Sequence, residues 1–281
     1  MSPKSSAQDY AVQSALNDLA NASGVLLDWD GCVAVADRPT AWAIRFIQER
    51  LNKIAIVSNN STSVPEDFAH ILAKHGIEID PCRIILAGVE ALKRAAELEP
   101  RSVLVLGDSR IKAYARGLGL PIVHDNAELV VLLRDLRFSY SRLQRAVNCL
   151  KAGARLIVAN PDMTHPGNHG ALVPETGALH AAISACLDGI AVETEVIGKP
   201  APRLFERACH ALGVKPQAAI MIGDNPATDI AGADAMSMQS ILIGARAAIG
   251  LENLVQGGTR QQSAASKKPP STIKATAIRN A

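Results

Sequence analysis

Short runs of apolar, mostly β-branched residues alternate along the chain with longer segments whose apolar positions recur at helical spacing. This alternation is typical of a mostly parallel sheet with helices on its faces. The short runs predict strands at 24–27, 54–57, 103–106, 129–133, 156–158, 219–222 and 240–243. The longer segments predict helices at 40–51, 65–75, 89–98, 141–152, 179–187, 202–212 and 226–233. We therefore expect an α/β fold around a doubly wound, mostly parallel sheet.

The length and the two ends of the chain refine this picture. At 281 residues, the chain is long enough for two modest domains, and 48% hydrophobic residues supply their cores. Residues 1–20 form an N-terminal extension to the first strand. Residues 257–281 hold almost no large apolar side chain, so we expect a disordered tail. That tail carries five basic residues and no acidic one, so the remaining body has a net charge of +2 − 5 = −3.

Composition excludes several classes of protein. A net charge of +2 and only 3% aromatic residues argue against a nucleic-acid partner. The longest apolar runs are about five residues, far short of the roughly 20 needed to span a bilayer. The first residues mix polar and charged side chains and do not resemble a secretion signal, which favours a cytoplasmic protein. The five cysteines are odd in number and form no C-x-x-C pair, so we interpret them as buried free thiols.

Three of the predicted strands end abruptly in polar residues. The first is followed by Asp28 and Asp30, the second by Ser58 and Asn59, and the strand at 219–222 by a Gly-Asp pair ending in Asp224. In open parallel sheets, ligands bind beyond the carboxyl ends of the strands. We therefore expect these side chains to converge on one crevice.

Asp28, Asp30, Asp224 and Asp229 would crowd that crevice with carboxylates. Acids so close repel one another, and a cation among them relieves the repulsion. Oxygen ligands without cysteine or paired histidine are those that Mg²⁺ prefers. Lys199, just before a predicted helix, suits an anion such as phosphate. Taken alone, each Asp could equally be a helix N-cap and Lys199 a solvated surface residue. Their combination in type, order and context favours a site.

These residues carry a resemblance to the haloacid dehalogenase superfamily of aspartyl phosphohydrolases. Its four motifs are matched by the D-x-D-G sequence at 28–31, by Ser58, by Lys199 and by the acidic segment at 223–229. The segments 57–61, 160–162, 197–200 and 223–230 further resemble the p-nitrophenyl phosphatase and pyridoxal-phosphate phosphatase branch. The resemblance covers roughly residues 22–250.

The resemblance implies an Mg²⁺-dependent phosphatase that acts on a small phosphorylated metabolite. The resemblance implies that Asp28 is the nucleophile and that Asp30 is the general acid and base. The metal is held by Asp28, the Asp30 carbonyl and Asp224. Ser58, the Asn59 amide and Lys199 bind the phosphoryl oxygens. Asn225 and Asp229 orient the groups around Lys199 and the metal.

The resemblance also implies an inserted α/β cap at 99–194, which leaves 21–98 and 195–256 as the core. Within the cap, Asn160, Asp162 and His165 are the candidates for facing the substrate. The sequence departs from the branch at two positions. At Cys32 a larger β-branched residue or Thr is commoner, and at Glu175 a glycine is usual. Caps in this branch often support dimers, so a homodimer stays open.

Two other functions remain as alternatives. A phosphomutase or phosphotransferase would use the same chemistry and return the phosphoryl group to a substrate. A phosphate-accepting signalling module also uses Asp, Mg²⁺, Ser or Thr and Lys on a doubly wound sheet. Such a module would comprise about 120 residues, and both the segment 99–194 and the second acid, Asp30, count against it.

Overall fold

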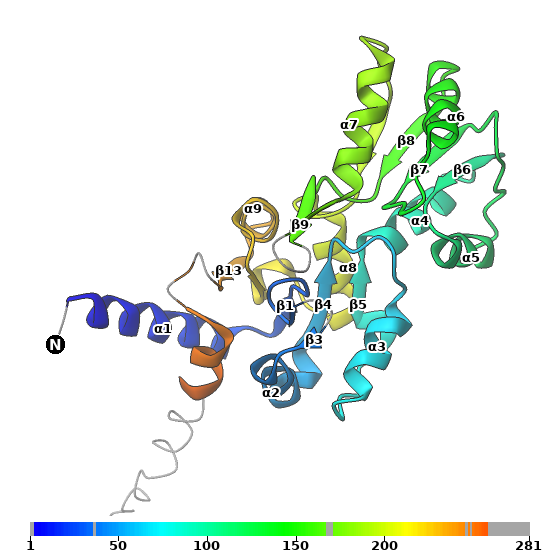
Figure 1. Ribbon diagram of the computed structural model, residues 1–281. Helices are drawn as coiled ribbons and strands as arrows, with labels where there is room; N and C mark the ends of the chain where they lie inside the picture. Colours follow the sequence, from blue (N-terminus) through cyan, green and yellow to red (C-terminus); the bar gives the residue numbers. More distant parts are fainter. Residues whose placement is uncertain (1–2, 36–37, 167–170, 245–246, 248, 258–281) are drawn as a thin grey trace, which may run out of the picture.

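The main sheet contains five parallel strands in the order β13, β12, β1, β4, β5 (Figure 1). This computed structural model describes residues 3–35, 38–166, 171–244, 247 and 249–257. The strands are β1 (Gly24–Leu27), β4 (Ile54–Ser58), β5 (Ile84–Leu86), β12 (Ala219–Gly223) and β13 (Gln239–Leu242). All residues of β1, β4, β5 and β12 are buried, as expected for a parallel sheet covered on both faces.

A second sheet of four parallel strands has the order β11, β8, β7, β6. The strands are β6 (Val103–Leu106), β7 (Leu129–Leu132), β8 (Arg155–Val158) and β11 (Thr194–Val196). This sheet lies almost wholly in the segment 99–194, and β11 ends at residue 196, slightly beyond it. The chain thus leaves the main sheet after β5, builds a second α/β unit and returns, which is the arrangement that an inserted domain requires.

Helices cover both sheets. They are α1 (Pro3–Asn21), α2 (Ala41–Arg50), α3 (Pro65–Ala73), α4 (Ala87–Glu97), α5 (Ser109–Gly117), α6 (Tyr140–Lys151), α7 (Thr176–Leu187), α8 (Arg203–Leu212) and α9 (Ala231–Ala235). A single π-helical turn, η5 (Pro226–Ile230), precedes α9. In α8, residues Leu204, Phe205, Ala208 and Cys209 share one buried stripe that packs against β1, β4 and β5. Gly213 ends α8 with φ of +67°, a conformation that costs glycine little.

Ion pairs join the two units where the chain crosses between them. The carboxylate of Glu90 in α4 is buried and lies 2.8 Å from Lys93 Nζ and 3.1 Å from Arg207 Nε of α8. Arg94 of α4 donates two 3.0 Å hydrogen bonds to Glu195 of β11. The helix α4, which precedes the second unit, is therefore joined by ion pairs to β11, the last strand of that unit, and to α8, the helix that follows Lys199.

Two short antiparallel hairpins complete the described fold. The first pairs β2 (Ala34–Val35) with β3 (Arg38–Pro39) and follows the D-x-D-G motif. The second pairs β9 (Thr164–Pro166) with β10 (Leu172–Pro174) and connects β8 to α7. In Figure 1, β9 lies between the second unit and the main sheet.

The predicted α/β fold is confirmed, and each predicted strand and helix has a counterpart within a few residues. The helix α1 was not predicted, because residues 1–20 were interpreted only as an extension. Its Ala15, Leu16 and Leu19 are buried against the main core. Also unpredicted are β5, β11, α5 and both hairpins. Most of these elements are too short for a periodicity to be visible in the sequence.

Three further sequence predictions have different outcomes. The predicted disordered tail lies outside the described residues, except for Gly257, which ends a short helix at 251–257. Among the helices of the described residues, none combines the length and apolarity needed to span a bilayer. The interpretation of the cysteines as buried is right for Cys32, Cys149 and Cys209 and wrong for the exposed Cys82 and Cys186.

The cysteines give a direct test of the fold. We expect a thiol-specific disulfide reagent to modify Cys82 and Cys186 in the folded protein and the other three only after unfolding. Burial raises the pKa of Cys209 to about 11, which removes its reactive thiolate at neutral pH. Partial burial, with the Asp80 carboxylate, also raises the pKa of Cys82, so Cys186 should react first. Peptide mapping of the labelled protein checks this order, and fast labelling of Cys32 or Cys149 would contradict the packing.

Candidate active site

The three polar strand ends lie next to one another. The strands β12, β1 and β4 are neighbours in the main sheet, and all three run in the same direction. Asp28 follows β1, Ser58 ends β4 and Asp224 follows β12. The backbone N–H of Asp28 donates to Ile222 O at 2.9 Å, which fixes it beside the end of β12.

Lys199 occupies the centre of this site. Its side chain is only 2% exposed, and Nζ donates to Asp28 Oδ1 and Asp229 Oδ1, each at 2.6 Å, and to Val57 O at 3.0 Å. Burial acts to lower the pKa of Lys199, but the two carboxylates outweigh it and hold that pKa above its usual value. Burial also raises the pKa of Asp28, and Lys199 opposes this effect. Lys199 is therefore the cation that lies between Asp28 and Asp229 and holds Asp28 in place.

Three carboxylates gather around a common point. Among the described residues, Asp28, Asp224 and Asp229 each offer an oxygen, and these oxygens lie within 4.8 Å of one another. Burial and the nearby Asp229 carboxylate raise the pKa of Asp224, while Lys199 lowers it. The ammonium of Lys199 offsets part of this negative charge. An all-oxygen, anionic donor set of this kind fits a hard divalent cation such as Mg²⁺.

Two glycines allow the carboxylates to come so close. Gly31 has φ of +79°, and a Cβ on it would lie 2.3 Å from Asp224 Oδ2. A Cβ on Gly223 would lie 2.3 Å from the Asp229 carboxyl carbon. The glycine of the first motif is thus required by the acid of the fourth motif as well as by its own backbone conformation.

Asp30 differs from Asp28 in its surroundings. The residue is exposed, whereas Asp28 is 5% exposed. Ser58 is fully buried, and its Oγ donates to Asp30 Oδ2 at 3.4 Å and accepts from the Asn60 backbone at 3.0 Å. One acid is therefore fixed beside a lysine and the other faces outward, so the two can perform different tasks.

The side chain of Asn59 connects the strand ends to the second unit. Its Oδ1 accepts from the Lys199 backbone at 2.7 Å, and its Nδ2 donates to Lys199 O at 3.1 Å and to Asp162 Oδ2 at 3.0 Å. Because this side chain is used within the protein, it is the backbone N–H of Asn59 that would meet a ligand. The side chain of Asn225 caps η5 by accepting from Ala227 N at 3.0 Å, and its backbone N–H holds Asp229 Oδ2 at 3.1 Å.

The three residues predicted to face a substrate have different surroundings. Asn160 is 1% exposed, and its amide donates to Asn59 O at 2.8 Å, which places it in the contact between the two units. Asp162 is half-buried; burial raises its pKa and the Asn59 bond lowers it. His165 keeps 37% of its side chain exposed and lies 2.7 Å from Glu175 Oε1. Of the three, His165 is the residue best placed to meet a ligand.

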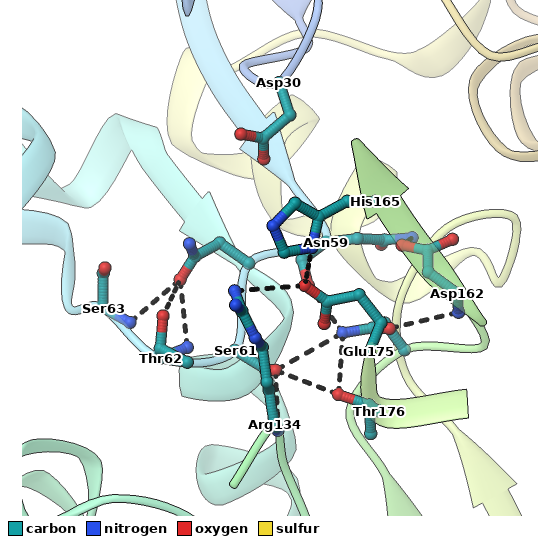
Figure 2. A network of polar contacts seen from close by, with 12 residues as sticks. Asp30, Asn59, Ser61, Thr62, Ser63, Arg134, Asp162, His165, Glu175 and Thr176 are labelled. Carbon is teal, nitrogen blue, oxygen red and sulfur yellow. Dashed lines mark hydrogen bonds and ion pairs between the residues drawn. The ribbon is translucent and has the colours of Figure 1, made fainter. Parts of the chain in front are cut away.

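A polar cluster joins these three to four residues that were not among the predicted site residues, Ser61, Arg134, Glu175 and Thr176 (Figure 2). Ser61 Oγ accepts from the Arg134 backbone at 3.0 Å and lies 3.1 Å from Thr176 Oγ1. Arg134 Nη1 and His165 Nδ1 both approach Glu175 Oε1. Two signals in the sequence pointed toward these residues: Ser61 ends the resembling segment 57–61, and Glu175 departs from the branch.

Family models match two segments of the chain. Residues 25–121 match the model for haloacid dehalogenase-like hydrolases, and residues 196–247 match a second HAD-hydrolase-like model. An acid sugar phosphatase of Staphylococcus aureus is 30% identical over 222 residues, which cover 77% of this chain and 84% of that protein. The chain belongs to the haloacid dehalogenase-like hydrolases.

Other relatives place it in the p-nitrophenyl phosphatase-like branch of this family. A dihydroxyacetone phosphatase of Corynebacterium glutamicum is 29% identical over 78% of this chain and 79% of that protein. A p-nitrophenyl phosphatase from Archaeoglobus fulgidus superposes with a TM-score of 0.74 at 26% identity, over 89% of this chain and 95% of the other. A magnesium complex of a glycerol phosphate phosphatase from Mycobacterium tuberculosis superposes with a TM-score of 0.71 at 27% identity, over 80% and 68%.

Proposed function

We propose that this haloacid dehalogenase-like hydrolase is a Mg²⁺-dependent phosphatase that releases phosphate from a small phosphorylated metabolite through an aspartyl-phosphate on Asp28. The arrangement of Lys199 between Asp28 and Asp229, beside Asp224, carries this proposal. It supplies a fixed carboxylate for attack and a cation for the phosphoryl charge in one buried place. The phosphatases among the relatives support the phosphoric monoester hydrolase class.

In the first step, an oxygen of Asp28 attacks phosphorus while the ester oxygen departs. Lys199 orients the attacking carboxylate and, with Ser58 and the Asn59 backbone, faces the negative phosphoryl oxygens. Asp30, which is exposed beside Ser58, gives its proton to the departing oxygen. In the second step, Asp30 takes a proton from the water that attacks phosphorus, and Asp28 is released unchanged.

The metal would be held by Asp28, Asp224 and the Asp30 carbonyl. When bound, Mg²⁺ neutralises part of the charge on the phosphoryl oxygens. The magnesium complex of the M. tuberculosis phosphatase supports a divalent metal in this fold. The role of the protein is to hold the carboxylates in one place against their mutual repulsion. Lys199 and the backbone N–H of Asn225, which donate to Asp28 and Asp229, perform this role.

The second α/β unit would act as the cap. Its polar residues Asn160, Asp162 and Arg134 reach the loop that follows Ser58, so it covers the side from which the ester oxygen leaves. The phosphate end is bound by the core whatever the leaving group is. Selection among substrates therefore belongs to the cap.

Removal of the metal tests the proposal. We expect chelation to abolish phosphate release from a panel of monoesters and added Mg²⁺ to restore it. Because Asp224 is a direct oxygen ligand in this account, Asp224→Asn should raise the Mg²⁺ concentration for half-maximal activity by at least about tenfold. Calorimetric titration with Mg²⁺ should show the same loss of affinity in the absence of substrate.

The exposed Asp234 of α9 provides a matched control. Asp234→Asn removes the same charge without touching the site, so its Mg²⁺ dependence should equal that of the unmodified protein. Phosphate release that survives exhaustive chelation, with Asp224→Asn unaltered, would contradict the proposal.

A further inference from the structure

Lys199 is held by the second unit through its backbone and by the main sheet through its side chain. The strand β11 ends at Val196, and its pairing with the chain that follows β8 continues up to the residue before Lys199, because the Gly198 N–H donates to Ala159 O at 2.8 Å. The Lys199 ammonium, in contrast, bonds to Asp28 at the end of β1. The position of Lys199 therefore depends on both units.

The side chain of Asn59 binds both polar groups of the Lys199 backbone. Asn59 Oδ1 accepts from the Lys199 N–H at 2.7 Å, and Asn59 Nδ2 donates to the Lys199 carbonyl oxygen at 3.1 Å. The two bonds form together in only one orientation of the amide plane. A rotation of that plane by half a turn would set oxygen against oxygen and N–H against N–H. A contact that fixes the Asn59 amide therefore also fixes the Lys199 backbone.

The carboxylate of Asp162 makes such a contact (Figure 2). Asp162 Oδ2 accepts from Asn59 Nδ2 at 3.0 Å. The Asp162 backbone is itself held on both sides, because its N–H donates to Asn160 Oδ1 at 3.1 Å and its carbonyl oxygen accepts from the Gly177 N–H at 2.8 Å. A Cβ on Gly177 would lie 2.7 Å from that carbonyl oxygen, so the close approach of α7 requires glycine. The second unit thus holds the acceptor in place.

These contacts distinguish Asp162 from a residue that binds the substrate. Asp162 is half-buried, and one of its carboxylate oxygens is already bonded to Asn59. A carboxylate also repels the negative phosphoryl group of an ester, so a direct contact between the two is unfavourable. The side chain of Asp162 is therefore directed to the protein that surrounds Lys199.

We propose that Asp162 is a positioning residue, which acts through the amide of Asn59 to keep the Lys199 backbone where its ammonium reaches Asp28 and the phosphoryl oxygens. This inference rests on the proposed phosphatase function and adds a residue that promotes catalysis without touching the substrate. Such placement matters because a displacement of about 1 Å at a reacting group can cost about a hundredfold in rate. The second unit thus contributes to the cleavage of every substrate, besides choosing among them.

The kinetic test compares Asp162→Ala with the unmodified protein on p-nitrophenyl phosphate and on glycerol phosphate, two esters with unlike leaving groups. A positioning residue affects both esters equally, so we expect kcat to fall about tenfold for each while KM stays within about twofold. Asp162→Asn keeps an oxygen within reach of Asn59 Nδ2 and should retain most of the activity. A contact with the substrate would instead raise KM for one ester more than for the other.

A double-mutant cycle tests whether Asp162 acts through Asn59. Asn59→Ala removes the amide and keeps the backbone N–H that faces the phosphoryl oxygens. In this background, Asp162→Ala should cause no further loss of kcat, because its connection to Lys199 is already absent. Two losses that multiply would show that the residues act independently, and this would overturn the inference.

Hydrogen–deuterium exchange provides a measurement that needs no substrate. The Lys199 N–H, which donates to Asn59 Oδ1, should exchange at least about tenfold faster in Asp162→Ala, with little change in Asp162→Asn. The amides of β12 should keep the exchange rates of the unmodified protein. Asp125→Ala, at an exposed aspartate of the second unit, is the matched control and should leave both exchange and kinetics unchanged.

The outcomes separate this inference from the function on which it rests. If the unmodified protein releases phosphate from neither ester, the proposed function fails, and exchange at the Lys199 amide alone decides whether Asp162 holds that residue. If the protein does cleave them, an Asp162→Ala variant with unaltered kcat, or with a loss toward one ester only, shows that the inference is wrong. Should Asp162→Ala not fold, Asp162→Leu takes its place, because leucine removes the acceptor at a similar volume.

Discussion

Replacement of Asp28 by asparagine should abolish turnover, with phosphate release falling by at least about a thousandfold. An amide is a very poor nucleophile, and no other carboxylate takes the same position at the end of β1. Asp28 is 5% exposed and is bonded to Lys199 at 2.6 Å, so a similarly shaped amide can keep the local packing. Steady-state phosphate release and thermal unfolding of the variant check both parts of this expectation.

The exposed Asp234 again supplies the control, because Asp234→Asn makes the same chemical change at a residue of α9 that is not part of the site. Its rate should match that of the unmodified protein. A folded Asp28→Asn variant that binds metal and still turns over rapidly would remove Asp28 from the role of nucleophile.

Replacement of Lys199 by methionine should have the largest combined effect on activity and stability. Methionine retains much of the apolar stem but leaves Asp28 and Asp229 buried without their cation. Removing one partner of a buried ion pair typically costs about 3–5 kcal/mol. We therefore expect the free energy of unfolding, measured with urea in metal-free buffer, to fall by about that amount. Phosphate release should also be lost, because the Lys199 ammonium no longer faces the negative phosphoryl oxygens.

The stability deficit should depend on pH. Burial raises the pKa of Asp28 in the folded protein, and Lys199 opposes that shift, so its loss raises this pKa further. A carboxyl whose pKa is higher in the folded state takes up a proton on folding, which favours the folded state as the pH falls. The deficit of Lys199→Met should therefore be larger at pH 8 than at pH 5. Lys215→Met, at an exposed lysine, should show no such deficit at either pH.

Much of the fold could be predicted because its signals are local. The buried parallel strands are continuous apolar runs, and each is bounded by polar residues or glycine. Asp28, Ser58 and Asp224 could be singled out for the same reason, since each directly ends or follows such a run. The neighbouring order of β12, β1 and β4 then brings them together.

The cluster around Ser61 could not be predicted because its contacts join distant parts of the chain. Ser61 bonds to the Arg134 backbone 73 residues away and to Thr176 115 residues away. Such contacts depend on how the second unit sits on the first, which no local pattern encodes. The helix α1 was missed for another reason. Only a few of its apolar residues are buried, and they lie among polar ones.

The central claim is that Asp28 carries the phosphoryl group during turnover, and trapping that intermediate tests it most directly. The protein is quenched during steady-state hydrolysis and treated with borohydride, which reduces an aspartyl-phosphate to homoserine, and its peptides are then sequenced by mass spectrometry. We expect homoserine at position 28 only when substrate and Mg²⁺ are both present, and none in Asp28→Asn. Homoserine at another aspartate, or none at position 28 under conditions of rapid turnover and demonstrated trapping, would contradict the account.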